Sequence, residues 1–137
     1  MDAVLIIGRT LFALIFINMG VMHLSKTEAM IGYATYKKVP TAKLAVIVSG
    51  LMILVGGLYV ASGVYADLGA LLIAIFLIPT AFMMHAFWKE SDATAKQNEM
   101  SSFFKDIALA GAALIIFVLV GSGADFGPSV TSAFFNF

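Results

Sequence analysis

Residues 68–88, LGALLIAIFLIPTAFMMHAFW, decide the fold of this chain. They form an apolar run without a single Asp, Glu, Lys or Arg, and the run stops at Lys89 and Glu90. A helix rises 1.5 Å per residue, so about 20 such residues cross the hydrocarbon core of a bilayer. The run also ends in Trp88 beside a lysine, a pattern typical of the membrane–water interface. Residues 68–88 are therefore predicted to form a membrane-spanning helix.

Three further apolar runs of similar length occupy residues 4–24, 44–61 and 103–121. Backbone polar groups in lipid must be satisfied within the segment, and no strand-like alternation is present, so we expect helices. The predicted fold is all-α: an antiparallel transmembrane four-helix bundle that forms one integral membrane domain over residues 1–137.

The connections between these runs differ in character. Residues 27–37 are predicted to form a short interfacial helix between the first two spans, stopped by Pro40. Residues 89–102 are charged, and we expect them to form a solvated loop. Residues 122–137 form an aromatic tail, whose phenylalanines we expect at the interface or against a neighbouring chain.

The composition supports a membrane environment and excludes several functions. The chain is 61% hydrophobic and only 12% charged, against about 25% charged residues in soluble domains. Lipid must therefore be its main solvent. It has no cysteine, which excludes disulfides, thiolate catalysis, iron–sulfur clusters and cysteine-ligated zinc. No metal site is predicted, and nothing in the sequence supports nucleic-acid binding.

Basic residues predict the orientation in the membrane. Lysines gather in the connections between the first and second and between the third and fourth spans, at Lys26, Lys37, Lys38, Lys43, Lys89 and Lys96. Loops that carry such an excess of lysine stay in the cytoplasm. Both basic loops are therefore expected to be cytoplasmic, and both termini outside.

Four residues are candidates for a ligand site. His23, His85, Trp88 and Lys105 each lie close to the cytoplasmic boundary of a predicted span, so antiparallel packing would bring them to one level. Ionisable groups at this depth either anchor the helices at the interface or form a small-molecule site, and both interpretations stay open. Two histidines on different helices could also ligate a haem, but nothing in their spacing requires one, and we expect none.

Arg9 lies inside the first span, where a charge must reach water or find a partner. Asp67, at the outer start of the third span, is the natural partner, with Asp2 as the alternative. We expect a structural ion pair between Arg9 and Asp67.

The sequence resembles the DoxX family of small four-span membrane proteins. The resemblance is carried by Gly8-Arg9, Phe16 and residues 20–23 in the first span, by PTAFMMHAFW at 79–88, and by FFKDIALAGAAL at 103–114. The family typically has Lys-Asn where this chain has Lys105-Asp106. Members include subunits of thiosulfate:quinone oxidoreductases and proteins linked to membrane redox complexes, and the resemblance implies a bacterial or archaeal cytoplasmic membrane.

Three functional hypotheses follow. The first is an accessory subunit of a larger membrane redox or respiratory complex, which is not an enzyme by itself, holds no cofactor and contacts other membrane subunits. The second is a quinone-binding oxidoreductase subunit, in which His23 or His85 donates a hydrogen bond to a quinone carbonyl. The third is a small-solute transporter.

Overall fold

The computed structural model describes every residue, 1–137, and contains helices but no strand. In chain order the elements are α1 (Asp2–Ser25), α2 (Thr27–Tyr36), α3 (Ala42–Ser62), α4 (Ala66–Met84), the short 3₁₀ helix η1 (Phe87–Lys89) and α5 (Ala93–Gly121). Four helical segments, α1, α3, α4 with η1, and α5, are long and apolar enough to cross a membrane. The predicted all-α fold with four spans is confirmed, and α2 occupies the position of the predicted short helix.

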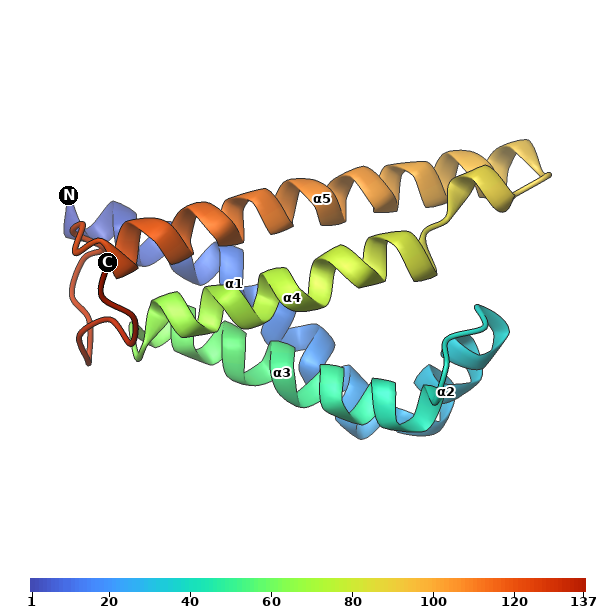
Figure 1. The fold of residues 1–137 in the computed structure, drawn as a ribbon, viewed down its shortest axis with the longest axis horizontal. Helices are drawn as coiled ribbons and strands as arrows, with labels where there is room; N and C mark the ends of the chain where they lie inside the picture. Colours follow the sequence, from blue (N-terminus) through green and yellow to red (C-terminus); the bar gives the residue numbers. More distant parts are fainter.

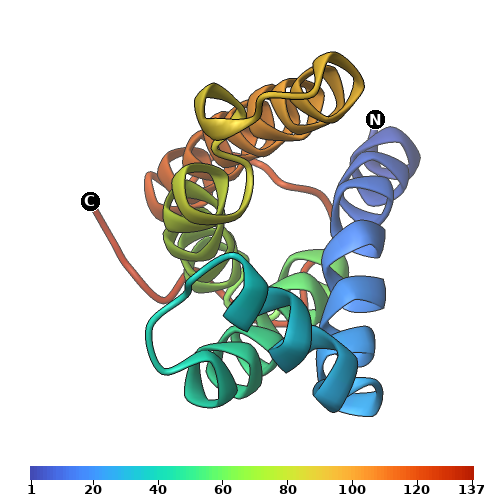
Figure 2. The same ribbon diagram turned by 90° about the vertical axis from the view of Figure 1, so that its right-hand side faces the viewer.

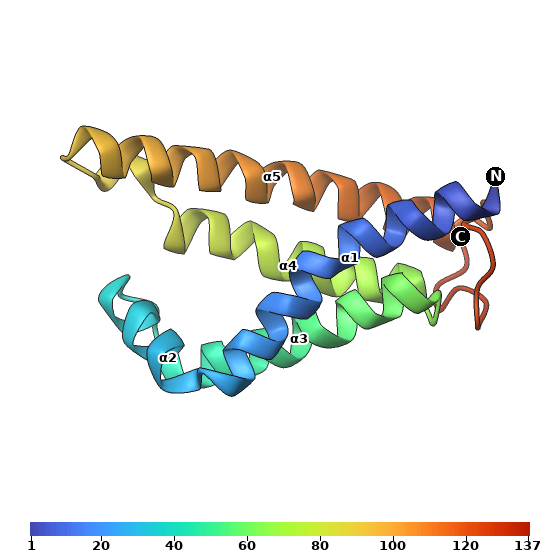
Figure 3. The same cartoon turned by 180° about the vertical axis from the view of Figure 1, so that it is seen from behind.

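The four long helices pack in chain order. α3 lies between α1 and α4, and α4 lies between α3 and α5 (Figure 1). Both termini lie at one end of the molecule, and α2 and the α4–α5 connection lie at the other (Figures 1 and 3). These are called the termini end and the α2 end below. Viewed from the α2 end, the long helices form an open arc with α1 and α5 at its tips (Figure 2).

Glycines bring the central helices into close contact. A Cβ atom on Gly50 of α3 would lie 2.6 Å from the Cβ of His23 on α1, and one on Gly56 would lie 2.8 Å from the carbonyl oxygen of Gly69 on α4. Without a hydrophobic force between helices in lipid, such close backbone approach is a main source of packing energy. The buried core beside these contacts is apolar and includes Ala13, Phe16, Ile53, Val60, Ala70, Ile73 and Leu77.

Two helix ends differ from the prediction. α4 ends at Met84, so His85 caps the helix and Trp88 belongs to η1. α5 begins at Ala93, where residues 89–102 were expected to be a loop, because the side chain of Asp92 accepts a hydrogen bond from the Ala95 amide at 2.8 Å and caps it. Hydropathy marks how far a helix runs in lipid, whereas capping decides where it begins.

The irregular tail, residues 122–137, lies at the termini end and holds Arg9. The Arg9 guanidinium, 6% exposed, donates to the carbonyl oxygens of Phe126 at 3.2 Å and Pro128 at 2.5 Å. It also lies over the ring of Phe126, with 5.8 Å from Cζ to the centroid. No carboxylate lies within ion-pair distance of this cation.

Asp67 holds the last residues of the same tail. Its fully buried carboxylate accepts hydrogen bonds from the amides of Phe134 at 2.9 Å and Phe135 at 2.6 Å. The predicted ion pair between Arg9 and Asp67 is therefore wrong, because each side chain binds the tail backbone instead. The tail phenylalanines also pack within the chain: Phe135 and Phe137 meet Phe117 with ring centroids 5.5 and 5.3 Å apart.

Candidate functional site

A cavity of about 450 Å³ lies at the α2 end, between α1, α2, α3 and the last turns of α4. This volume is in the range of small-molecule sites in proteins. Most of its lining is apolar and comes from Met19, Met30, Ala34, Val39, Val46, Met52, Ile75, Phe76, Pro79, Met83 and Met84. The polar side chains in the lining are His23, Tyr33, Ser49, Thr80 and His85. The cavity is thus apolar, with a few polar groups on its wall.

His23 stands on the last turn of α1 and faces α3. Its Nδ1 atom is 3.2 Å from the carbonyl oxygen of Val46 and 3.2 Å from the hydroxyl oxygen of Ser49. The close approach at Gly50 allows this reach, because a side chain there would collide with His23. The Nε2 atom has no hydrogen-bond partner in the protein.

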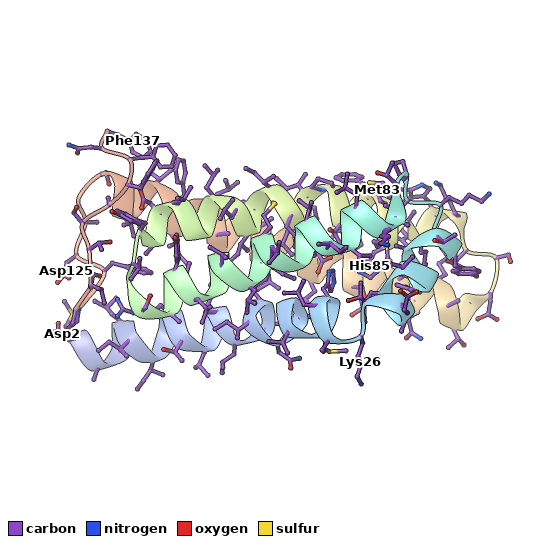
Figure 4. The ribbon with its side chains drawn as sticks, turned by 90° about the horizontal axis from the view of Figure 1, so that it is seen from below. Asp2, Lys26, Met83, His85, Asp125 and Phe137 are labelled. Atoms are coloured by element: carbon purple, nitrogen blue, oxygen red, sulfur yellow. The ribbon has the colours of Figure 1, made fainter.

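His85 reaches α5 from the end of α4, and Figure 4 shows it at the α2 end of the molecule, near Met83. Its Nδ1 atom is 2.7 Å from a carboxylate oxygen of Glu99, and its Nε2 atom is 3.6 Å from one of Asp106. Both ring nitrogens therefore face protein carboxylates. Because His85 leaves the helix to meet α5, it connects the cavity wall to a network of charged side chains.

Lys37 extends that network to α2. Its ammonium group lies 2.6 Å from the second carboxylate oxygen of Glu99 and 3.7 Å from Glu90. Partial burial works against the charged form, but the hydrogen bond to Glu99, the neighbouring Tyr33 and the charges of both carboxylates outweigh it and raise the pKa of Lys37 above its ordinary value. α2 packs against α1 and α3, so this ion pair ties it to the α4–α5 side of the cavity.

Trp88 and Lys105 lie outside the cavity lining. Trp88 is 49% exposed and packs in an aromatic cluster with Phe82 and Phe103, at centroid distances of 6.3 and 5.6 Å. Lys105 is exposed on α5, whereas its neighbour Asp106 is buried. The structure thus brings His23 and His85 to one cavity and leaves the other two predicted residues out. His85 and Trp88 do not lie on one α-helix, because α4 ends at Met84 and Trp88 belongs to η1.

Glu99 and Lys37 were missed by sequence reasoning. The sequence places Glu99 in a segment expected to be a solvated loop, and it places Lys37 at the end of the predicted interfacial helix, among the lysines that predict orientation. Their partners are distant in the chain: 62 residues separate Lys37 from Glu99. The sequence signal for both residues is the charge that gathers in the two lysine-rich connections.

One comparison with known proteins gives a match. The DoxX family model matches residues 4–86, which is more than half of the chain and ends just after the predicted ligand residue His85. No curated protein matches the chain, and no solved structure matches it.

Proposed function

Because the chain belongs to the DoxX family, we propose that it is a quinone-binding subunit of a larger membrane redox complex. The observation that carries the proposal is the cavity at the α2 end, whose apolar wall holds both histidines of the chain. A quinone has a flat ring with apolar faces and polar oxygens at its edge. An apolar cavity with a few polar groups suits such a ligand.

The methionines of the cavity support the same ligand class. Five of the eight methionines in the chain line it, namely Met19, Met30, Met52, Met83 and Met84. Methionine side chains are flexible and polarisable, and their sulfur atoms make favourable contacts with ring edges. Phe76, on the same wall, offers an aromatic face for stacking.

The subunit role follows from what quinone chemistry requires. Electrons must reach the quinone from a donor, and this chain has no cysteine to hold an iron–sulfur cluster or to act as a thiol. A partner subunit would supply the redox group, and this chain would supply the site. A purely accessory subunit would use the same helix contacts but would retain no ligand. A transporter would need a polar path past the apolar core at Ile53 and Ile73, and both of these side chains are fully buried.

Trp88 makes the proposal easy to test, because it is the only tryptophan and lies three residues after His85. The full-length protein in mild detergent should yield a quinone on organic extraction. Once stripped, it should bind trimethylbenzoquinone with saturable quenching of Trp88 fluorescence. Phe76→Ala should weaken binding, because Phe76 lines the cavity, whereas Asn18→Ala should not, because Asn18 is exposed on α1 and outside the cavity lining. Wild-type protein that neither retains nor binds a quinone would leave only the accessory role.

A further inference from the structure

We infer that His23 makes the cavity prefer the reduced, hydroxyl-bearing form of its ligand, given the quinone-class ring proposed above. The expectation that a histidine donates a hydrogen bond to a quinone carbonyl is thereby reversed: the free nitrogen of His23 accepts. The inferred preference concerns binding alone and involves no electron transfer.

The direction follows from the partners of His23 Nδ1. A backbone carbonyl oxygen can only accept, so the 3.2 Å contact to Val46 places the hydrogen on Nδ1. The hydroxyl of Ser49 itself donates to the same carbonyl at 3.2 Å, and its oxygen accepts from His23. No carboxylate lies within ion-pair distance of His23 to favour a second ring proton. The neutral ring therefore carries its unshared electron pair on Nε2.

That nitrogen is open to a ligand. His23 Nε2 makes no hydrogen bond within the protein. Among the side-chain polar atoms that are shielded from solvent, only Nε of Arg9, at the termini end, lacks a hydrogen-bond partner. Nε2 is thus accessible, and His23 belongs to the cavity wall. A ligand hydroxyl placed there would satisfy the acceptor, whereas a ligand carbonyl would face a second lone pair.

The donors of the cavity wall are largely committed. The hydroxyl of Thr80 donates to the carbonyl of Phe76 at 2.7 Å, and that of Ser49 donates to Val46. Nδ1 of His85 lies 2.7 Å from Glu99, whereas its Nε2 lies 3.6 Å from Asp106, beyond hydrogen-bond distance. The remaining hydroxyl belongs to Tyr33 on α2, whose ring lies beside the ammonium of Lys37 at 5.7 Å. The wall therefore offers a free acceptor at His23 but few free donors, which favours a quinol over a quinone.

Three ligands with the same ring test the preference: trimethylhydroquinone, trimethylbenzoquinone and the dimethyl ether of the hydroquinone. Binding is followed anaerobically through Trp88 in the detergent-solubilised full chain. Wild type should bind the hydroquinone about tenfold more tightly than either other ligand, the usual effect of leaving one buried polar group unpaired. His23→Phe should bind all three alike. Ser49→Ala should keep the preference, because Val46 still holds the Nδ1 hydrogen.

Ring nitrogen spectroscopy gives a second readout that needs no variant. With only two histidines in the chain, ¹⁵N-histidine labelling resolves each ring. His23 should show a protonated Nδ1 and a bare Nε2, and Nε2 should shift when the hydroquinone is added. Equal affinity for the three ligands, or a hydrogen on Nε2, overturns the preference while the proposed function stands. No binding of any of the three overturns the proposed function itself.

Discussion

At the scale of single residues, Gly50 determines whether His23 can reach the carbonyl of Val46. A Cβ on Gly50 would stand 2.6 Å from the Cβ of His23 and 3.3 Å from a methyl carbon of Leu24, so α1 would have to move away. The hydrogen bond that fixes the His23 ring would lengthen with that movement. Gly50 thus lets His23 approach α3 closely enough to reach Val46.

Gly50→Ala is therefore expected to lower stability by about 1–3 kcal/mol, the usual cost of overpacking a tight contact. Thermal unfolding of the purified protein in detergent measures the change. Gly111→Ala is the matched control, because a Cβ at Gly111 on α5 would meet nothing within 4 Å. The control should be neutral or stabilising by about 0.5–1 kcal/mol, since alanine is the better helix former. Equal melting temperatures for the two variants would show that α1 and α3 are not in close contact.

At the scale of elements, α2 acts as a wall of the cavity that is fixed on one side by packing and on the other by charge. Met30 and Tyr33 of α2 belong to the lining. The helix packs on α1 and α3, and Lys37 beyond its last turn reaches Glu99 on α5. The side chains of this pair are 13% and 17% exposed, so solvent screens it only in part.

Lys37→Gln should loosen α2 and open the cavity. Because the chain has no cysteine, a single Met30→Cys gives a specific reporter, and its rate of alkylation should rise about fivefold if the pair contributes about 1 kcal/mol. Lys43→Gln is the matched control, since Lys43 is exposed and forms no ion pair. Unchanged labelling in Lys37→Gln would mean that packing alone holds α2.

The pH dependence of this contact follows from the raised pKa of Lys37. A lysine whose folded pKa is raised stabilises the fold below its unfolded value, near 10.5, and this contribution is lost only as pH rises through the higher folded value. The labelling rate of Met30→Cys, corrected for thiolate content, should therefore stay constant between about pH 7 and 9.

At the scale of the whole molecule, the structure places both termini at one end and both lysine-rich connections at the other (Figures 1 and 4). The excess of lysine predicts that this second end faces the cytoplasm, with the termini and the tail outside. In that predicted orientation the cavity would lie at the cytoplasmic level of the membrane, and Arg9 and Asp67 would hold the tail at the outer level.

Single cysteines test this orientation in intact cells. Ser91→Cys, exposed in the α4–α5 connection, should be protected from a membrane-impermeant reagent, and Ser132→Cys, exposed in the tail, should be labelled. Ser91→Cys should become reactive once the membrane is made permeable. Labelling of Ser91→Cys in sealed cells would reverse the topology.

The number, type and approximate length of the spans can be predicted from the order of the residues alone, because hydropathy is a local property. Residues 68–88 need no distant partner to be recognised as a helix in lipid. The positions of His23 and His85 along their spans can be predicted in the same way, since a helix rises by a constant amount per residue. Both histidines do line one cavity.

The contacts that these side chains make depend on how the helices and the tail pack together. His85 lies beyond the end of α4, and its ring nitrogens face Glu99 and Asp106 of α5. The hydrogen bond by which Asp92 caps the start of α5 does not appear in a hydropathy pattern. Arg9 and Asp67 are two buried charges at one end, which suggests a pair by depth alone. In the structure each side chain instead forms hydrogen bonds with the backbone of the tail. The irregular tail has carbonyls and amides available for such bonds, whereas those inside a helix bond to one another. The depth of a residue in the membrane follows from its position along its helix. The rotation of that helix about its axis, and the partners of each side chain, depend on elements that are distant in sequence.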